Sequence, residues 1–306
     1  MSNKIKDKCF NSEAIYGRLP DRPDHLDVDL IGRDNGFAGG YAALNNIQLV
    51  LEVNEMAIGL PIHSVIPKTD LPCPAIIHLG YEDAIPNRFL PAEEIIERGY
   101  AIFNINVNDV SPISPDFKSG AAARISLSRR KSNAPGKLCL WAWAARVVVD
   151  YVCKLDNIDK ESIIIAGHGI CGEAAMICAE SDERIRYVIA NEVIQRGNHS
   201  TDTPYLFSPS YAGGDTEDRI KMLIAACVDK YILLGAAAGA PLADSAGDRE
   251  LIAELISENA LSENKIHYHS RRGTEYFSRK DWSLFLDFID DKSGNKPSFD
   301  NICLHF

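Results

Sequence analysis

The chain has 306 residues, of which 46% are hydrophobic and 25% charged, with 32 Lys and Arg against 43 Asp and Glu. This composition predicts a large apolar core and excludes wholesale disorder. The net charge of -11 argues against nucleic acid as a partner, because phosphate binding needs clustered basic residues. No apolar run approaches the ~20 residues that span a bilayer, and residues 1–9 lack a hydrophobic signal segment. We therefore expect a cytoplasmic protein with no membrane partner.

The first part of the chain predicts antiparallel strands followed by the start of an α/β pattern. Residues 46–54 and 60–66 alternate apolar and polar side chains, which is typical of half-exposed strands. We expect antiparallel strands over about 25–66 to belong to the main sheet. The next predicted elements are a buried strand at 74–79, a helix at 91–98 and a strand at 101–107.

The second part of the chain alternates helices and strands after a long loop at about 108–136. The predicted order is helix 138–154, strand 162–166, helix 173–180, strand 186–190, helix 216–227, strand 230–234, helix 247–257, strand 265–268 and helix 278–290. This alternation predicts one α/β domain over residues 1–306, with a mostly parallel central sheet flanked by helices on both faces. The eight Cys have scattered spacings that indicate reduced thiols and no metal site.

A glycine-rich turn lies between the predicted strand 162–166 and the helix that follows it. Residues 167–172 read Gly-His-Gly-Ile-Cys-Gly, which matches the GxGxxG pattern of dinucleotide-binding turns. Glu192 closes the next strand, where such folds place a carboxylate for the ribose hydroxyls. Several strands and a long helix precede this turn, however, whereas dinucleotide-binding units place the pattern in their first strand–helix turn. Dinucleotide binding is therefore kept only as an alternative.

Five segments in chain order carry a resemblance to a known family: YGRLPDRPDHLDVDLIGRD (16–34), PNRFLPAEEIIERGYAI (86–102), LWAWAARVVVDYV (140–152), AGHGICGEAAMICAESDERIRYVIANE (166–192) and KDWSLFLDFID (280–290). Through them the chain resembles the glucuronoyl and acetyl xylan esterase-like carbohydrate esterases of the α/β-hydrolase superfamily. The resemblance implies an α/β-hydrolase fold. It also implies that residues 167–171 form the turn called the nucleophile elbow, G-x-S-x-G, which presents a serine above the sheet.

The residues that the family uses for catalysis are replaced in this sequence. The resemblance places Gly169 at the nucleophilic serine and Ile170 at an arginine that follows it. The histidine base, which precedes the final helix in the family, corresponds to Glu275. Of the family's acidic stretch after strand 230–234, residues 236–240 are Ala and Gly, and only Asp244 remains; Glu192 is the alternative acid.

These replacements predict a catalytically inactive esterase-like protein, because ester hydrolysis by this route needs nucleophile, base and acid together. Such a protein could keep a cleft for a small molecule or a protein partner, and we expect no cofactor. Two ways to retain hydrolysis stay open. Cys171 lies in the first turn of a helix, where a thiol can become nucleophilic, and Glu275 could pair with Asp244 or Glu192 for acid–base catalysis.

Overall fold

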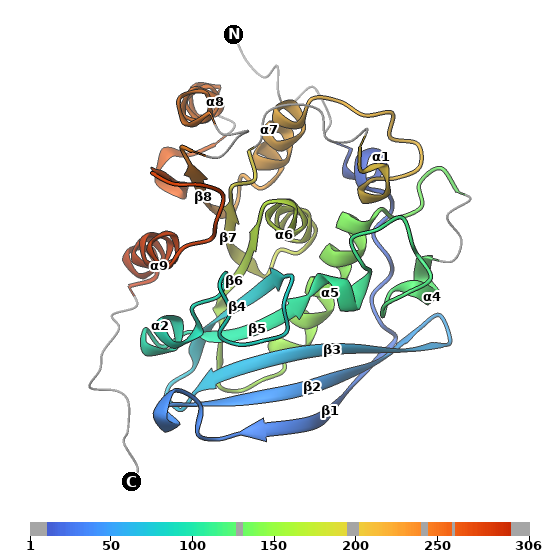
Figure 1. The fold of residues 1–306 in the computed structure, drawn as a ribbon, viewed down its shortest axis with the longest axis vertical. Helices are drawn as coiled ribbons and strands as arrows, with labels where there is room; N and C mark the ends of the chain where they lie inside the picture. Colours follow the sequence, from blue (N-terminus) through green and yellow to red (C-terminus); the bar gives the residue numbers. More distant parts are fainter. Residues whose placement is uncertain (1–10, 127–130, 195–201, 240–243, 259–260, 295–306) are drawn as a thin grey trace.

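The computed structural model describes residues 11–126, 131–194, 202–239, 244–258 and 261–294 (Figure 1). Within these residues, nine strands form one sheet in the order β1-β2-β3-β5-β4-β6-β7-β8-β9. The strands are β1 (His25–Asp34), β2 (Ala42–Val53), β3 (Met56–Pro67), β4 (Cys73–Gly80), β5 (Ala101–Asn106), β6 (Ile158–His168), β7 (Ile185–Asn191), β8 (Tyr231–Ala237) and β9 (Ile266–Arg271).

The sheet changes from antiparallel to parallel along its strand order. The first three strands pair antiparallel with one another, and β3 pairs antiparallel with β5. All later pairs, from β5 and β4 to β8 and β9, are parallel. The central parallel strands contain apolar runs, such as Ile163–Ala166 in β6 and Tyr187–Ala190 in β7, and all eight residues of β4 are buried, as expected for a sheet covered on both faces. This confirms the predicted α/β-hydrolase architecture.

Helices cover both faces of the sheet and bury two separate cores (Figure 1). The larger core contains side chains of α5, α6, α7 and α8, and the smaller one contains side chains of α2 and α9. The helices are α1 (Ser12–Tyr16), α2 (Ala92–Glu97), α3 (Val107–Val110), α4 (Ala123–Ser126), α5 (Lys137–Val152), α6 (Ile170–Ser181), α7 (Thr216–Ala226), α8 (Ser245–Ser257) and α9 (Arg279–Ser293). In α5, 14 residues are buried, including Trp141 and Trp143, which explains why its sequence is apolar on several sides.

The structure differs from the sequence-based elements mainly at their ends. Helix α6 begins at Ile170 instead of residue 173, and Gly169 is its N-cap residue. The loop predicted at 108–136 contains the short helices α3 and α4. Residue 240, the last of the Ala/Gly stretch at 236–240, lies outside the described residues.

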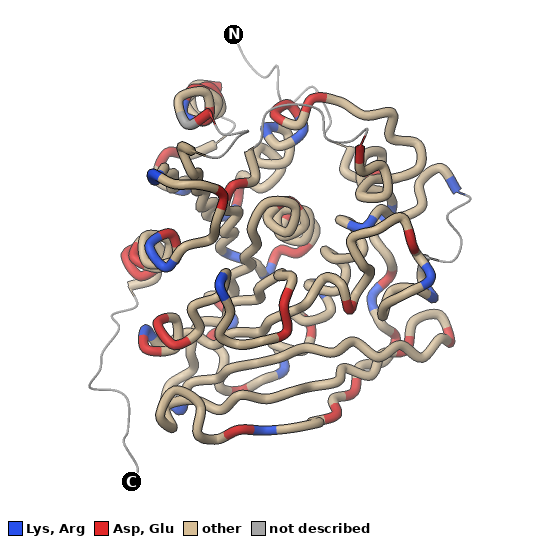
Figure 2. Tube along the Cα trace, in the orientation of Figure 1, with Lys and Arg blue, Asp and Glu red and all other residues tan. Residues whose placement is uncertain are grey.

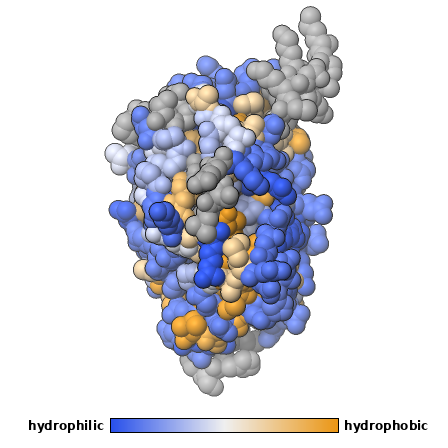
Figure 3. All heavy atoms as spheres, turned by 90° about the vertical axis from the view of Figure 1, so that its right-hand side faces the viewer, coloured by the Kyte–Doolittle hydropathy of each residue, from blue (hydrophilic) through white to orange (hydrophobic). Residues whose placement is uncertain are grey.

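Acidic and basic residues are both spread over the outer helices and loops (Figure 2). Helices α2 and α9 lie next to each other, and Arg98, just after α2, pairs with Asp287 and Asp290 of α9. The face shown in Figure 3 is mostly hydrophilic with scattered apolar areas. Among the described residues, no helix combines the length and apolarity needed to cross a membrane.

Histidine His78 of β4 gives the fold a testable dependence on pH. Its ring is buried, and Nδ1 donates a hydrogen bond to Asn104 Oδ1 over 2.8 Å. Burial lowers the pKa of His78 from 6.5 to about 4. Between these two values the unfolded chain binds a proton that the folded chain does not, so the free energy of unfolding falls as the pH falls.

We expect this histidine to remove about 3 kcal/mol of stability between pH 6.5 and pH 4. Urea unfolding of the wild type and of His78→Gln across this range measures the effect as a difference in slope. The variant should be less stable at pH 7 but should lose less stability on acidification. His25→Gln, at an exposed position of β1, is the matched control and should keep the wild-type slope. Equal slopes for all three proteins would contradict the assignment.

Candidate functional site

The strand-to-helix turn after β6 has the backbone of a nucleophile elbow but no side chain at its apex. Gly169 stands between β6 and α6 with φ 56° and ψ −124°. Its N–H donates to Asn191 O over 2.9 Å, and its carbonyl oxygen accepts from Glu173 N over 3.1 Å. A Cβ built on Gly169 would have no atom within 4 Å. The apex therefore points into open space, where an elbow presents its nucleophile.

The other two glycines of the 167–172 pattern have packing roles. A Cβ on Gly167 would overlap the carbonyl group of Cys171, so this close approach of strand and helix requires glycine. A Cβ on Gly172 would lie 3.3 Å from the Cα of Ala190 in β7. The GxGxxG spacing is thus accounted for by contacts inside the turn and against the neighbouring strand. Dinucleotide binding stays a prediction.

Cys171 lies in the first turn of α6, but its side chain points into the protein. The residue is fully buried, and burial raises the pKa of its thiol to about 12. At neutral pH almost none of it is thiolate, which is the reactive form. The geometry therefore opposes Cys171 as a relocated nucleophile.

His168, the last residue of β6, is the functional group that the sequence analysis left without a role. Its side chain is 7% exposed and lies between the rings of Phe89 and Phe277, whose centroids are 5.5 and 6.1 Å away. Nδ1 lies 3.0 Å from Asn191 Nδ2. Burial lowers the pKa of His168 to about 4, so the imidazole is neutral at pH 7. A polar residue at the carboxyl end of a parallel strand is the signal that could have identified it.

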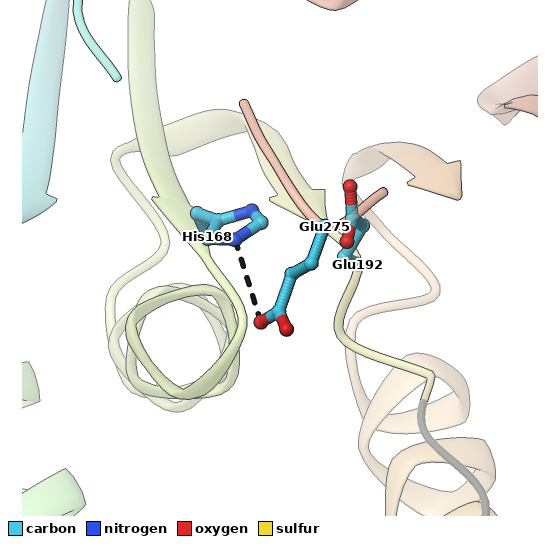
Figure 4. A group of neighbouring side chains, drawn as sticks. All are labelled: His168, Glu192 and Glu275. Carbon is cyan, nitrogen blue, oxygen red and sulfur yellow. Dashed lines mark ion pairs between the residues drawn. The ribbon is translucent and has the colours of Figure 1, made fainter. Parts of the chain in front are cut away.

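Glu275 lies in the loop between β9 and α9 and points toward His168 (Figure 4). Its Oε1 is 3.7 Å from His168 Nε2, and its side chain is 54% exposed. Arg271 holds this loop by donating to the carbonyl oxygens of Thr274 and Tyr276. Glu275, which the sequence resemblance places at the histidine position, therefore lies beside the elbow as a carboxylate.

Glu192 follows β7 and brings a second carboxylate to the same place (Figure 4). Its backbone has φ 52°, an uncommon value for a residue with a side chain. Its Oε1 accepts hydrogen bonds from Arg271 Nη2 over 3.0 Å and from Tyr276 N over 3.1 Å. Burial raises the pKa of Glu192 to about 7, and repulsion by Glu275 adds to this shift. Glu192 can thus be protonated or ionised near neutral pH.

Asp281 binds Arg271, which in turn contacts the site. It is the third residue of α9 and is fully buried, and its Oδ2 accepts from Arg271 Nε over 2.8 Å. Its Oδ1 lies 2.8 Å from His269 Nε2. Burial alone would raise the pKa of Asp281, but hydrogen bonds from His269, Arg271 and Ser278 outweigh it and lower the pKa to about 2. A fixed negative charge therefore holds Arg271 against Glu192.

Asp244, the acid that remains after the Ala/Gly stretch, is a helix-capping residue. It is exposed, and its Oδ1 accepts a hydrogen bond from Gly247 N over 3.1 Å, which caps the N-terminus of α8. The cluster beside the elbow instead consists of His168, Glu192 and Glu275, whose nearest ligand atoms all lie within 4.8 Å of one another. These groups can exchange protons or hold a cation.

The nine-stranded sheet and the elbow are those of the α/β-hydrolase fold. A model of the family described as "Glucuronyl esterase, fungi" matches residues 51–216, more than half of the chain. The chain therefore belongs to the glucuronyl esterase family, which confirms the resemblance found in the sequence.

Individual relatives are more distant in sequence. "Carbohydrate esterase MZ0003", from an unknown prokaryotic organism, is 23% identical over 241 residues. That alignment covers 65% of this chain and 55% of the relative, so the chain spans about half the length of the curated relative it matches.

Solved structures of glucuronoyl esterases have the same fold. The enzyme from Solibacter usitatus superposes with a TM-score of 0.79 at 18% identity, covering 90% of this chain and 88% of that one. The enzyme from Caldicellulosiruptor kristjansonii, of carbohydrate esterase family 15, gives a TM-score of 0.69 at 21% identity, covering 96% and 86%.

The backbone at Gly169 can be tested by adding a Cβ. Because a Cβ there meets no atom within 4 Å, the cost of Gly169→Ala should come from the positive φ alone, about 1–2 kcal/mol of unfolding free energy. Gly32→Ala in β1, whose Cβ would make an ordinary contact at 3.4 Å, is the control and should change stability by less than about 0.5 kcal/mol. Urea denaturation measures both. An unchanged midpoint for Gly169→Ala would show that the turn is not strained as described.

Proposed function

We propose that this chain is a member of the glucuronyl esterase family that does not hydrolyse esters and keeps the elbow region for binding. The observation that carries this proposal is the backbone of Gly169, which has the elbow conformation and no side chain. The ligand class that we propose is an ester of a uronic acid, because solved structures with this fold are named as glucuronoyl esterases.

The neighbouring side chains support the loss of hydrolysis. A covalent route needs a nucleophile activated by an oriented base. The Cys171 thiol is buried and its pKa is raised, so it is a poor nucleophile. The position of the histidine base is occupied by Glu275, a carboxylate that only accepts hydrogen bonds when it is ionised. His168 is buried between aromatic rings, and its Nδ1 faces Asn191. Loss of a triad member reduces the rate by about 10⁴-fold or more.

The start of helix α6 supports the retained binding. The first N–H groups of a helix have no partner inside the helix and carry the positive end of its dipole. In this chain they begin at Ile170, directly after the open apex at Gly169. The carbonyl oxygen of a bound ester can accept from such groups in the space that a serine side chain would fill.

A second candidate function rests on the two carboxylates. Glu192 has a pKa of about 7, in the range that suits a general acid or base, and Glu275 lies within 4.8 Å of it by their nearest oxygens. In this alternative, the chain hydrolyses its substrate with one carboxylate activating water and the other donating a proton.

Rebuilding the missing groups tests the proposal. We expect the wild type, assayed with a methyl or benzyl glucuronate ester and EDTA, to be at least about 10⁴-fold slower than an active glucuronoyl esterase. Gly169→Ser and Glu275→His should each stay near this background. The double variant should gain at least about tenfold, because it restores a nucleophile together with a base.

Two results would contradict the proposal and would separate its rivals. Clear hydrolysis by the wild type that disappears in Cys171→Ala would identify a rewired thiol enzyme. Clear hydrolysis that disappears in Glu192→Gln and survives in Cys171→Ala would establish the carboxylate pair. Asp244→Asn is the matched control, because Asp244 caps α8 and should not influence either activity.

A further inference from the structure

Three side chains at the ends of separate strands meet beside the empty apex of the elbow. His168 ends β6, Glu192 follows β7, and Glu275 lies in the loop after β9. Their nearest imidazole and carboxylate atoms lie within 4.8 Å of one another (Figure 4). From this geometry we propose that the chain binds one divalent first-row transition metal ion, of which Zn²⁺ is the representative, through His168, Glu192 and Glu275.

The buried imidazole is the independent observation that points to a ligand. The His168 side chain is 7% exposed and is fixed by the rings of Phe89 and Phe277. Its Nε2 is directed at Glu275, but the 3.7 Å distance is too long for a hydrogen bond, and no other partner for Nε2 is found among the described residues. Among the described residues, the buried Oδ1 of Asn191 has no hydrogen-bond partner, while Asn191 Nδ2 lies 3.0 Å from His168 Nδ1. Turning this amide would let Oδ1 accept from Nδ1–H, which leaves the lone pair of Nε2 for an ion.

The charges around the cluster favour a cation. Glu192, Glu275 and Asp281 bring three carboxylates, whereas Arg271 is the guanidinium that faces them through its contacts with Glu192 and Asp281. Arg271 binds Oε1 of Glu192 and thereby orients this carboxylate, as groups behind metal ligands do. Glu275 is more than half exposed, so its side chain can move by the ångström or more that closes the cluster around an ion.

The residue types select the kind of ion. Imidazole with two carboxylates suits Zn²⁺, Mn²⁺ or Fe²⁺, whereas Mg²⁺ and Ca²⁺ prefer oxygen ligands alone. Three protein ligands leave a coordination position for water or for an oxygen of a bound ligand.

Isothermal titration of the full chain with ZnCl₂ tests this site. We expect one Zn²⁺ per chain, at least tenfold weaker binding in Glu275→Gln and in Glu192→Gln, and much weaker binding of Mg²⁺ and Ca²⁺ to the wild type. Glu275 is exposed, so its substitution should leave the fold intact, as circular dichroism would verify. His25→Asn is the matched control, because His25 and Asp27 form an exposed pair 3.0 Å apart that should not bind Zn²⁺ tightly.

Other outcomes would overturn the site. Binding that is absent, or that remains unchanged in both glutamate variants, would mean that these residues do not hold an ion. Titration with Co²⁺ gives a second readout, since a thiolate-to-metal absorption band would assign the ion to cysteine. This test does not depend on the proposed loss of ester hydrolysis. The titrations measure binding, whereas the hydrolysis assays contain EDTA, so either proposal can fail while the other stands.

Discussion

The close approach of β6 to α6 at residues 167–172 is the constraint on which the site depends. The carbonyl group of Cys171 fills the space where a side chain on Gly167 would be, and Gly172 packs against Ala190 of β7. Together these contacts require the chain to reverse within one residue, which gives Gly169 its positive φ. The turn is therefore determined by packing within the sheet and helix, and it persists although the residue at its apex has no side chain that could react.

A second constraint acts from the opposite side of the site. Asp281 is buried at the start of α9 and takes part in a capping box with Ser278. It holds Arg271, which in turn binds Glu192 and the loop that carries Glu275. The positions of the Glu192 and Glu275 carboxylates thus depend on the ion pair between Asp281 and Arg271. Breaking a buried pair of this kind leaves an unpaired charge and costs about 3–5 kcal/mol of folding free energy. The placement of the two carboxylates is therefore coupled to the folding of β9 and α9.

The order of strands and helices could be predicted from the sequence because the central parallel strands β4, β6, β7 and β8 contain apolar runs and the helices between them are periodic. The edge strand β1 was indicated only as part of residues 25–66, since most of its residues are exposed and its pairing with β2 defines it. The early start of α6 was missed because glycines usually weaken a helix, and tertiary packing outweighs that tendency here. The position of His168 at the carboxyl end of a parallel strand could have marked it as a site residue, but its surroundings could not be predicted, because Phe89, Phe277 and Glu275 are distant in sequence.

The replacements in the site change its electrostatic preference in one direction. Where the family resemblance places an arginine, this chain has Ile170, and where it places a histidine, the chain has Glu275. The first change removes a positive charge, and the second adds a negative one next to Glu192. Ester hydrolysis develops negative charge on an oxygen, which such a site would repel. The same two changes favour a positively charged occupant. Loss of the nucleophile and gain of the carboxylate are therefore consistent with one another. A serine restored at Gly169 alone would still face a site whose charge opposes the transition state of ester hydrolysis.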